Sequence, residues 1–292
     1  MSILHIRHHT RYEYRTPVQL GEHRLMTRPR DSHDLRLLDT AIEIQPAASQ
    51  VRWIHDVFGN SIAIVGFDTS AQVLQFTSDF HAQHFPVTER GIAIESYASS
   101  FPFSYSAADA EDLGRTKERH YPDPEHRVDD WARMLLQEVP QARTLDTLAA
   151  MAVAIKENFK YEARDAPGVQ TPVETLERGS GSCRDFALFM MEAVRSLGLA
   201  ARFVSGYLYD EQRIDAGERL VGGGVTHAWM QVYLPGAGWV EYDPTNALVG
   251  GRNLIRVAVT RDPSQAVPVA GSFKGEVDAG LSMSVSVEVT AA

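Results

Sequence analysis

Residues 179–198 read GSGSCRDFALFMMEAVRSLG, and this stretch carries the signal that decides the fold. Its apolar residues recur at three- and four-residue steps, as on one face of a helix: Phe186, Met190, Ala193 and Leu197. Ser182 stands before them as an N-cap with Asp185 three residues later, and Gly198 follows as a stop signal. The stretch therefore predicts a capped helix whose first turn contains Cys183.

Cys183 is the only cysteine among the 292 residues, which excludes an internal disulfide and any site built from several thiolates. The partial positive charge at a helix N-terminus favours thiolate over thiol. A backbone N–H at the same helix end can donate to the oxyanion that forms when the sulfur attacks a carbonyl. This position favours a nucleophile, and a buried structural cysteine under a capped helix is the alternative interpretation.

Two later segments offer a base and a group to orient it. His227 opens an expected strand at about 225–234, and Asp243 ends the next one at about 238–243, directly before Pro244. A helix-start cysteine, a strand histidine and an aspartate at the end of the adjacent strand fit a Cys-His-Asp triad. Taken singly, the histidine reads as a packing residue and the aspartate as a turn former.

The triad hypothesis makes a geometric demand on the hairpin between these two strands. His227 and Asp243 share one face of an antiparallel pair only if the numbers of paired residues add up to an even number. A four-residue loop would pair Leu234 with Trp239, which gives an odd sum. We therefore predict a three- or five-residue loop, or a bulge, that places Asp243 opposite Trp229 and diagonal to His227.

The pattern along the chain changes between its two halves. Residues 1 to about 105 alternate apolar and polar residues between turn signals, which predicts an antiparallel β-sandwich with strands at Thr10/Tyr12/Tyr14, Ile42/Ile44, Val51/Trp53, Ile62/Ile64, Leu74/Phe76 and Ile92/Ile94. Residues 104–125 lack periodicity and predict a linker or covering loop. Helical spacing follows, including a helix with Thr144 as its N-cap, and then further strands.

The sequence therefore predicts an α+β protein in three parts. We place a β-sandwich domain at residues 1–110, an α+β core at 125–250 and a strand-rich C-terminal tail at 251–292. No internal repeat or low-complexity tract interrupts this order.

Several segments closely resemble the core of the transglutaminase-like superfamily: FKYEA (159–163), GSCRDFALFMMEAVRSLGLAARFVSGY (181–207) and THAWMQVYLPGAGWVEYDPTN (226–246). The resemblance covers roughly residues 130–250. In addition, HTRYEYRTPVQLGEHRLMTRPR (9–30) and DVFGN (56–60) resemble the β-domain that precedes this core in bacterial members. The resemblance implies a papain-like, transglutaminase-like α+β core after the β-domain.

The resemblance also implies the chemistry of a thiol enzyme. It assigns Cys183 as the nucleophile, His227 as base and acid, and Asp243 as the group that holds the imidazole, with a thioester intermediate. Its members act on peptide or protein amide bonds, either as transglutaminases or as cysteine peptidases and amidases. The choice between an amine and water as acceptor stays open, because it depends on loop shape and water exclusion.

Two other interpretations of the core compete with the enzyme. One is a catalytically inactive peptide-binding module, although a pure binder has no physical need for all three groups. The other is a mononuclear metal site that joins Cys183 and His227 to one N-terminal histidine: His8, His9, His23 or His33. A single thiol and the absence of short histidine spacing on a helix disfavour it, so we expect no metal and no cofactor.

Other residues near the predicted triad have two interpretations each. Tyr161 and Trp229 are candidates for a second oxyanion donor, and both also fit simple core packing. The run Gly222–Gly224 reads either as a flexible turn or as a mobile rim of the site.

Composition and charge limit the partners of the protein. The net charge is −10, the pI is about 5.5 and no basic cluster occurs, which argues against nucleic-acid binding. The first fifteen residues lack an apolar signal-peptide core, and no later run approaches the ~18 apolar residues of a membrane span. We therefore expect a cytoplasmic protein with a peptide or protein amide substrate, no nucleic-acid partner and no membrane partner; the oligomeric state stays open.

Overall fold

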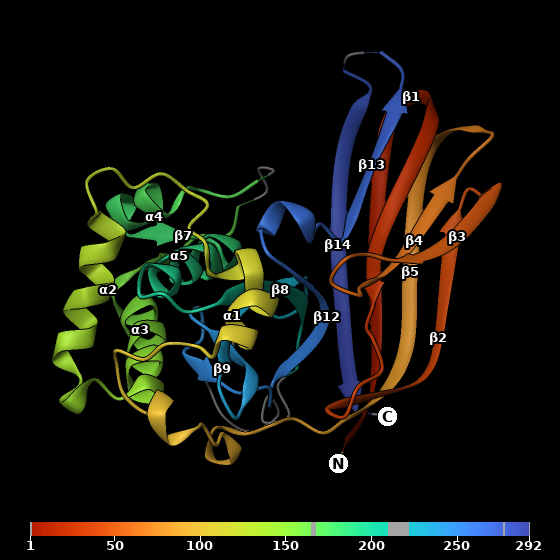
Figure 1. The fold of residues 1–292 in the computed structure, drawn as a ribbon. Helices are drawn as coiled ribbons and strands as arrows, with labels where there is room; N and C mark the ends of the chain where they lie inside the picture. Colours follow the sequence, from red (N-terminus) through yellow and green to blue (C-terminus); the bar gives the residue numbers. More distant parts are fainter. Residues whose placement is uncertain (1, 165–167, 210–221, 277, 292) are drawn as a thin grey trace.

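The computed structural model describes residues 2–164, 168–209, 222–276 and 278–291. It consists of an antiparallel sheet built from both ends of the chain and an α+β core built from the residues between them (Figure 1). The α+β class, with an antiparallel N-terminal sheet and a transglutaminase-like core, is confirmed. No helix in the described part of the chain is long and apolar enough to cross a membrane.

Seven strands of the described chain form the first sheet: β1 (Ser2–Arg28), β2 (Leu35–Gln45), β3 (Gln50–His55), β4 (Ser61–Gly66), β5 (Ser70–His84), β13 (Val269–Lys274) and β14 (Gly280–Ala291). The register between β1 and β5 breaks between Glu13 and Val18. Strands on both sides of β1 share one apolar cluster, which includes Ile44 of β2, Phe76 of β5 and Val65 of β4. The alternating pattern of the N-terminal sequence thus produces one buried face and one exposed face.

One predicted strand in this region is wrong. Ile92 and Ile94 follow a short 3-10 helix, η1 (Glu89–Gly91), in a segment without strand pairing. Both side chains pack against the apolar cluster of the α+β core instead. Their two-residue spacing reflects contact with the core rather than a pleated strand.

The C-terminal tail returns to the N-terminal sheet. Both of its last strands pair with β1, and β14 runs antiparallel to it from Leu4 opposite Ala291 to Tyr12 opposite Met283. The tail is rich in strands, as its sequence predicts, while the domain boundaries themselves stay a prediction. This pairing brings the far end of the chain next to the core (Figure 1).

The core contains five α-helices within the described residues: α1 (Ala107–Leu113), α2 (Arg127–Glu138), α3 (Thr144–Asn158), α4 (Pro172–Arg178) and α5 (Cys183–Ser196). Its main sheet has the order β11-β10-β9-β8-β12, with bounds β8 (Ala201–Leu208), β9 (His227–Leu234), β10 (Gly238–Asp243), β11 (Leu248–Val249) and β12 (Leu254–Thr260). A short parallel pair joins β6 (Lys160–Tyr161) to β7 (Ser180–Gly181). The remaining 3-10 turns are η2 (Ser96–Ala98), η3 (Gly114–Lys117), η4 (Pro140–Ala142) and η5 (Pro263–Gln265).

Two details of the helical region differ from the prediction. Residues 104–125 include α1 and η3, whose mostly polar sequence hides their helical character. The N-cap position of α3 is Arg143, and Thr144 is the first helical residue. The Thr144 hydroxyl donates to the carbonyl oxygen of Ala98 at 2.6 Å, so its side chain ties the helix to the preceding segment.

Helix α5 lies at the centre of the core. Its apolar residues share one cluster with the even-numbered residues of β9 and β10, such as Met230 and Tyr242. The odd-numbered residues of these strands face the other side of the sheet, since side chains alternate along a strand. Consequently, His227 and Asp243 both lie on the face of the sheet that does not pack against the apolar side of α5.

Candidate active site

The start of α5 is fixed by a buried carboxylate. Asp185 accepts hydrogen bonds from the backbone N–H and the hydroxyl of Ser182, both at 2.8 Å. Its other oxygen accepts from the backbone N–H of Gln170 at 2.7 Å and from the guanidinium of Arg164 at 2.8 Å. This network orients the first turn of α5, which agrees with the capping role predicted for Asp185.

Cys183 is the first residue of α5, as its sequence context predicts. The first N–H groups of a helix have no partner within the helix, so this end can bind negative charge. The side chain of Cys183 is 9% exposed and borders a pocket of about 400 Å³. Cys183 is therefore largely shielded from bulk solvent and lies at the edge of this pocket.

The register of the β9–β10 hairpin is the predicted one. Leu234 pairs with Gly238 across a three-residue loop, and the ladder continues to Met230 opposite Tyr242. The same register places Asp243 opposite Trp229. It brings His227 Nε2 to 2.9 Å from Asp243 Oδ2, with both side chains fully buried.

The Asp243 carboxylate is held from two further directions. Its Oδ1 accepts from the backbone N–H of Thr245 at 2.9 Å, and its Oδ2 accepts from the Asn246 side-chain amide at 2.7 Å. Neither residue was a candidate from the sequence. The only available signal was their position in the turn Asp243-Pro244-Thr245-Asn246, where an aspartate commonly bonds to the backbone two residues later.

The environment of His227 favours its charged form. Burial lowers the pKa of this imidazole, but the charge and hydrogen bond of Asp243, with a further contribution from Cys183, raise it to about 10. The other ring nitrogen, Nδ1, is buried and has no nitrogen or oxygen partner among the described residues. Since Nε2 bonds to Asp243, it is the Nδ1 edge that interacts with the Cys183 side chain.

The imidazole is also confined on its sides. The ring of Trp229 stacks near it, with centroids 6.0 Å apart and planes inclined by 25°. Gly222 has a φ of +96°, and a Cβ added there would lie 2.5 Å from His227 Nδ1. The first glycine of the run at 222–224 therefore lies directly against the ring, which favours the rim interpretation over that of a simple turn.

The pocket beside Cys183 receives residues from both parts of the molecule. Met283 and Val285 of β14 line it together with Val225 and Val267. Three of these apolar side chains are exposed, Met283 by 57% and Val225 and Val267 each by 42%. The last strand of the chain thus supplies part of an apolar wall next to the thiol.

Comparison with known families follows this division of the chain. Residues 4–83 match the bacterial transglutaminase-like N-terminal region, and residues 133–244 match the transglutaminase-like superfamily core. The chain belongs to the transglutaminase-like superfamily.

Individual proteins are also similar to this chain. The uncharacterized protein Rv2569c of Mycobacterium tuberculosis is 26% identical over 275 residues, which cover 91% of this chain and 86% of that protein. The uncharacterized protein ML0607 of Mycobacterium leprae is 34% identical over 118 residues, 40% of each chain. A protein-glutamine gamma-glutamyltransferase of Pseudomonas aeruginosa is 29% identical over 177 residues, 58% of this chain but 25% of that enzyme.

A solved structure shares the whole fold. A candidate cysteine protease from Cytophaga hutchinsonii superposes with a TM-score of 0.73 at 16% identity, covering 99% of this chain and 90% of that chain. At this identity the likeness concerns the fold alone. The arrangement in which both chain ends form one sheet beside a transglutaminase-like core therefore also occurs outside this protein.

The two oxyanion candidates of this transglutaminase-like protein have different environments. Trp229 is fully buried, and its indole N–H donates to the carboxylate of Glu241, so it is a core residue and not a donor to substrate. Tyr161 lines the pocket with Cys183. Burial and the neighbouring Cys183 raise the pKa of the Tyr161 phenol to about 12, so the hydroxyl keeps its proton at neutral pH and can donate it.

The structure does not bring together the ligands of the alternative metal site at the thiol. In the described part of the chain, neither Cys183 nor His227 belongs to a group of side chains that could hold an ion together. Three of the four N-terminal histidines have other partners: His8 bonds to the Tyr207 hydroxyl at 2.7 Å, His9 bonds to Thr77 at 3.0 Å, and His23 bonds to the carbonyl oxygen of Gly21 at 2.9 Å.

Proposed function

We propose that this protein is a thiol acyl-transfer enzyme that acts on peptide or protein amide bonds through Cys183, His227 and Asp243. One observation carries the proposal: the hairpin register joins a buried His227 to Asp243 and leaves the opposite edge of the ring to Cys183. A histidine with a raised pKa beside a helix-start cysteine supports a thiolate–imidazolium pair. A peptide-binding module would need no such pair.

The reaction that this geometry supports has two halves. In the first, the Cys183 thiolate attacks the amide carbonyl carbon, and the backbone N–H groups at the start of α5 stabilise the oxyanion. The carbon–nitrogen bond then breaks, and His227 gives the proton of Nδ1 to the leaving amine or ammonia. This step leaves a thioester on Cys183 and a neutral imidazole.

In the second half, an acceptor replaces the sulfur. An amine or a water molecule attacks the thioester carbon and loses a proton to His227 Nδ1, and the carbon–sulfur bond breaks to restore the thiolate. An amine acceptor gives transglutamination, and water gives hydrolysis. The Pseudomonas relative is named a protein-glutamine gamma-glutamyltransferase and the Cytophaga protein a candidate cysteine protease. In the proposed reaction, transfer and hydrolysis share the same acyl-enzyme.

The pocket suggests a substrate feature. Met283, Val285 and Val267 offer apolar contact within the pocket that Cys183 borders. A peptide with an apolar side chain near the reacting amide would bury this surface, at roughly 25 cal/mol per Å². We therefore propose peptide or protein substrates of this type.

The test is a mass-spectrometric screen of a peptide library containing glutamine and apolar residues, with and without a primary amine such as cadaverine. An added amine minus ammonia identifies the transferase, whereas cleavage or deamidation identifies the hydrolase. Cys183→Ala is the control, and Cys183→Ser keeps the volume of the side chain. Products that form equally with Cys183→Ala would refute the proposal, and peptides that bind without conversion would favour the binding module.

A further inference from the structure

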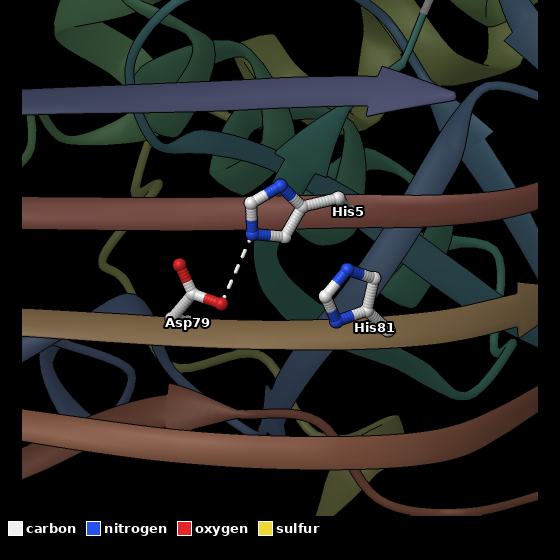
Figure 2. Close-up of side chains that lie close together, drawn as sticks. All are labelled: His5, Asp79 and His81. Atoms are coloured by element: carbon white, nitrogen blue, oxygen red, sulfur yellow. Dashed lines mark hydrogen bonds and ion pairs between the residues drawn. The ribbon is translucent and has the colours of Figure 1, made fainter. Parts of the chain in front are cut away.

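A second cluster of reactive side chains lies on the N-terminal sheet, away from the thiol. His5 comes from β1 and Asp79 and His81 come from β5, and the three side chains lie together across these neighbouring strands (Figure 2). Their strand neighbours Ile6 and Phe80 point to the opposite face, where they are buried against the core. The cluster therefore lies on the solvent face of the sheet.

The strand register brings these side chains together. His5 pairs directly with His81, and Asp79 is two residues before His81 on the same face. The imidazole rings of the two histidines stack with centroids 4.4 Å apart and planes inclined by 10°. His5 Nε2 lies 3.0 Å from Asp79 Oδ1, and one potential ligand atom from each residue lies within 4.8 Å of the other two.

A fourth residue orients one of the rings. Asp39 of β2 pairs with His81, and its Oδ1 lies 3.0 Å from His81 Nδ1. In metal sites, a ligating histidine commonly donates its other ring N–H to a carboxylate, which fixes the tautomer and makes the ligand more basic. Asp39 occupies this place for His81 and leaves Nε2 of that ring as the ligand atom.

We propose that His5, Asp79 and His81 bind a divalent transition-metal ion of the zinc class, with Asp39 as the group that positions His81. Two imidazoles and one carboxylate form an open ligand set that suits Zn²⁺. Tetrahedral Zn²⁺ at about 2.1 Å from each ligand separates the ligand atoms by about 3.4 Å. The His5–Asp79 contact is already close to this value, and the ligand atom of His81 has to move closer. His81 and Asp39 are partly exposed, with side chains that are 36% and 66% accessible, so the two can shift together while their hydrogen bond is kept.

The bound ion would link β1 directly to β5 and, through Asp39, to β2. These strands also supply Leu4, Ile6 and Phe80 to the apolar contact with the core. The ion would therefore brace the side of the molecule that supports β14 without touching the thiol. Arg7 lies opposite Asp79 in the register, but within the described residues the structure shows no ion pair between them.

The test measures binding of Zn²⁺ alone by isothermal titration and elemental analysis, with untagged protein that carries Cys183→Ala so that the thiol cannot bind the ion. We expect one ion per chain. His5→Ala and His81→Ala should each weaken binding at least 100-fold, and Asp39→Asn about 10- to 100-fold. His9→Ala is the matched control, because His9 lies on the same strand and face and bonds to Thr77, and it should leave the affinity unchanged.

A second measurement uses the unsubstituted surface. Zn²⁺ should protect His5 and His81, but not His9, from diethylpyrocarbonate, as read by peptide mass spectrometry. It should also raise the melting temperature of the parent and not that of the His5→Ala/His81→Ala double variant. Unchanged affinity in either single variant, no binding at 100 µM Zn²⁺, or equal modification of the three histidines would overturn the proposal and leave an ordinary His5–Asp79 ion pair.

Discussion

Replacing Asp243 by asparagine tests how the buried carboxylate controls His227. Asp243 Oδ2 faces two donors, His227 Nε2 at 2.9 Å and the Asn246 amide at 2.7 Å, and Oδ1 faces the N–H of Thr245. An asparagine NH₂ group in either position meets at least one donor. When the NH₂ group takes the place of Oδ2, its contact with His227 is favourable only if Nε2 loses its proton and accepts a hydrogen bond from the amide.

This change moves the remaining imidazole proton to Nδ1, the edge that faces Cys183. The neutral ring then cannot accept the thiol proton. The substitution also removes the negative charge of Asp243, which contributes most to raising the pKa of His227 from 6.5 to about 10. A shift of that size corresponds to a factor of roughly 10³ in favour of imidazolium. We therefore expect Asp243→Asn to lower kcat/KM about 10³-fold, in line with the effect of removing the orienting aspartate in other triads.

The assay is steady-state hydrolysis of an activated thiol-enzyme substrate such as p-nitrophenyl acetate, together with the peptide identified by the library screen. Circular dichroism should show a folded variant that is less stable by about 1–3 kcal/mol, because a buried donor stays unpaired. Asp130→Asn, at a carboxylate that is 71% exposed, is the neutral control. A kcat/KM of Asp243→Asn within tenfold of the parent value would refute the reasoning and reduce Asp243 to a turn former.

Three further predictions follow from the same site. Because the pKa of His227 is raised in the folded state, its charge stabilises the fold fully below the unfolded pKa of about 6.5, and this stabilisation is lost as the pH rises through about 10. Between these pH values the free energy of unfolding should fall by up to about 5 kcal/mol more in the parent than in His227→Gln. Denaturant unfolding at a series of pH values measures this, and an equal dependence on pH in the two proteins would contradict it. Gly222→Ala should cost about 1–3 kcal/mol of stability and lower kcat roughly 100-fold, because the new methyl group displaces the imidazole. Gly224→Ala is the control: at φ +87° it should share the backbone strain but keep kcat, because its added Cβ would have no neighbouring atom within 4 Å. Equal kcat values in the two variants would show that contact with the ring is unimportant. Met283→Asp places a charge in the apolar wall of the pocket, so it should lower kcat/KM about tenfold for peptides with an apolar side chain. The rate at which iodoacetamide alkylates Cys183 should stay unchanged. An unaltered peptide preference would exclude β14 from substrate binding.

Local signals in the sequence were sufficient to place the proposed catalytic groups. The capped start of α5 depends on residues 182–185 alone, so spacing and residue type predict it. The hairpin register followed from the requirement that His227 and Asp243 share a face, and the structure has the three-residue loop that satisfies this requirement. Both are short-range features that a single sequence contains.

Other features depend on contacts between distant segments. The pairing of β14 with β1 joins residues about 280 positions apart, and nothing in the tail sequence specifies that partner. Ile92 and Ile94 have strand-like spacing, yet the core surface determines their burial. The contact of Gly222 with His227 depends on the path of the chain before β9, which glycine content does not reveal.

The most direct test of the central claim is the rate of Cys183 alkylation by iodoacetamide as a function of pH, in the parent protein and in His227→Ala. An ordinary thiol with a pKa near 8.5 is only about 0.3% ionised at pH 6. If His227 and Cys183 form the proposed thiolate–imidazolium pair, the parent rate should stay near its plateau at pH 6, and His227→Ala should follow the profile of an ordinary thiol. A parent profile that rises only around pH 8.5, with no change in His227→Ala, would contradict the account.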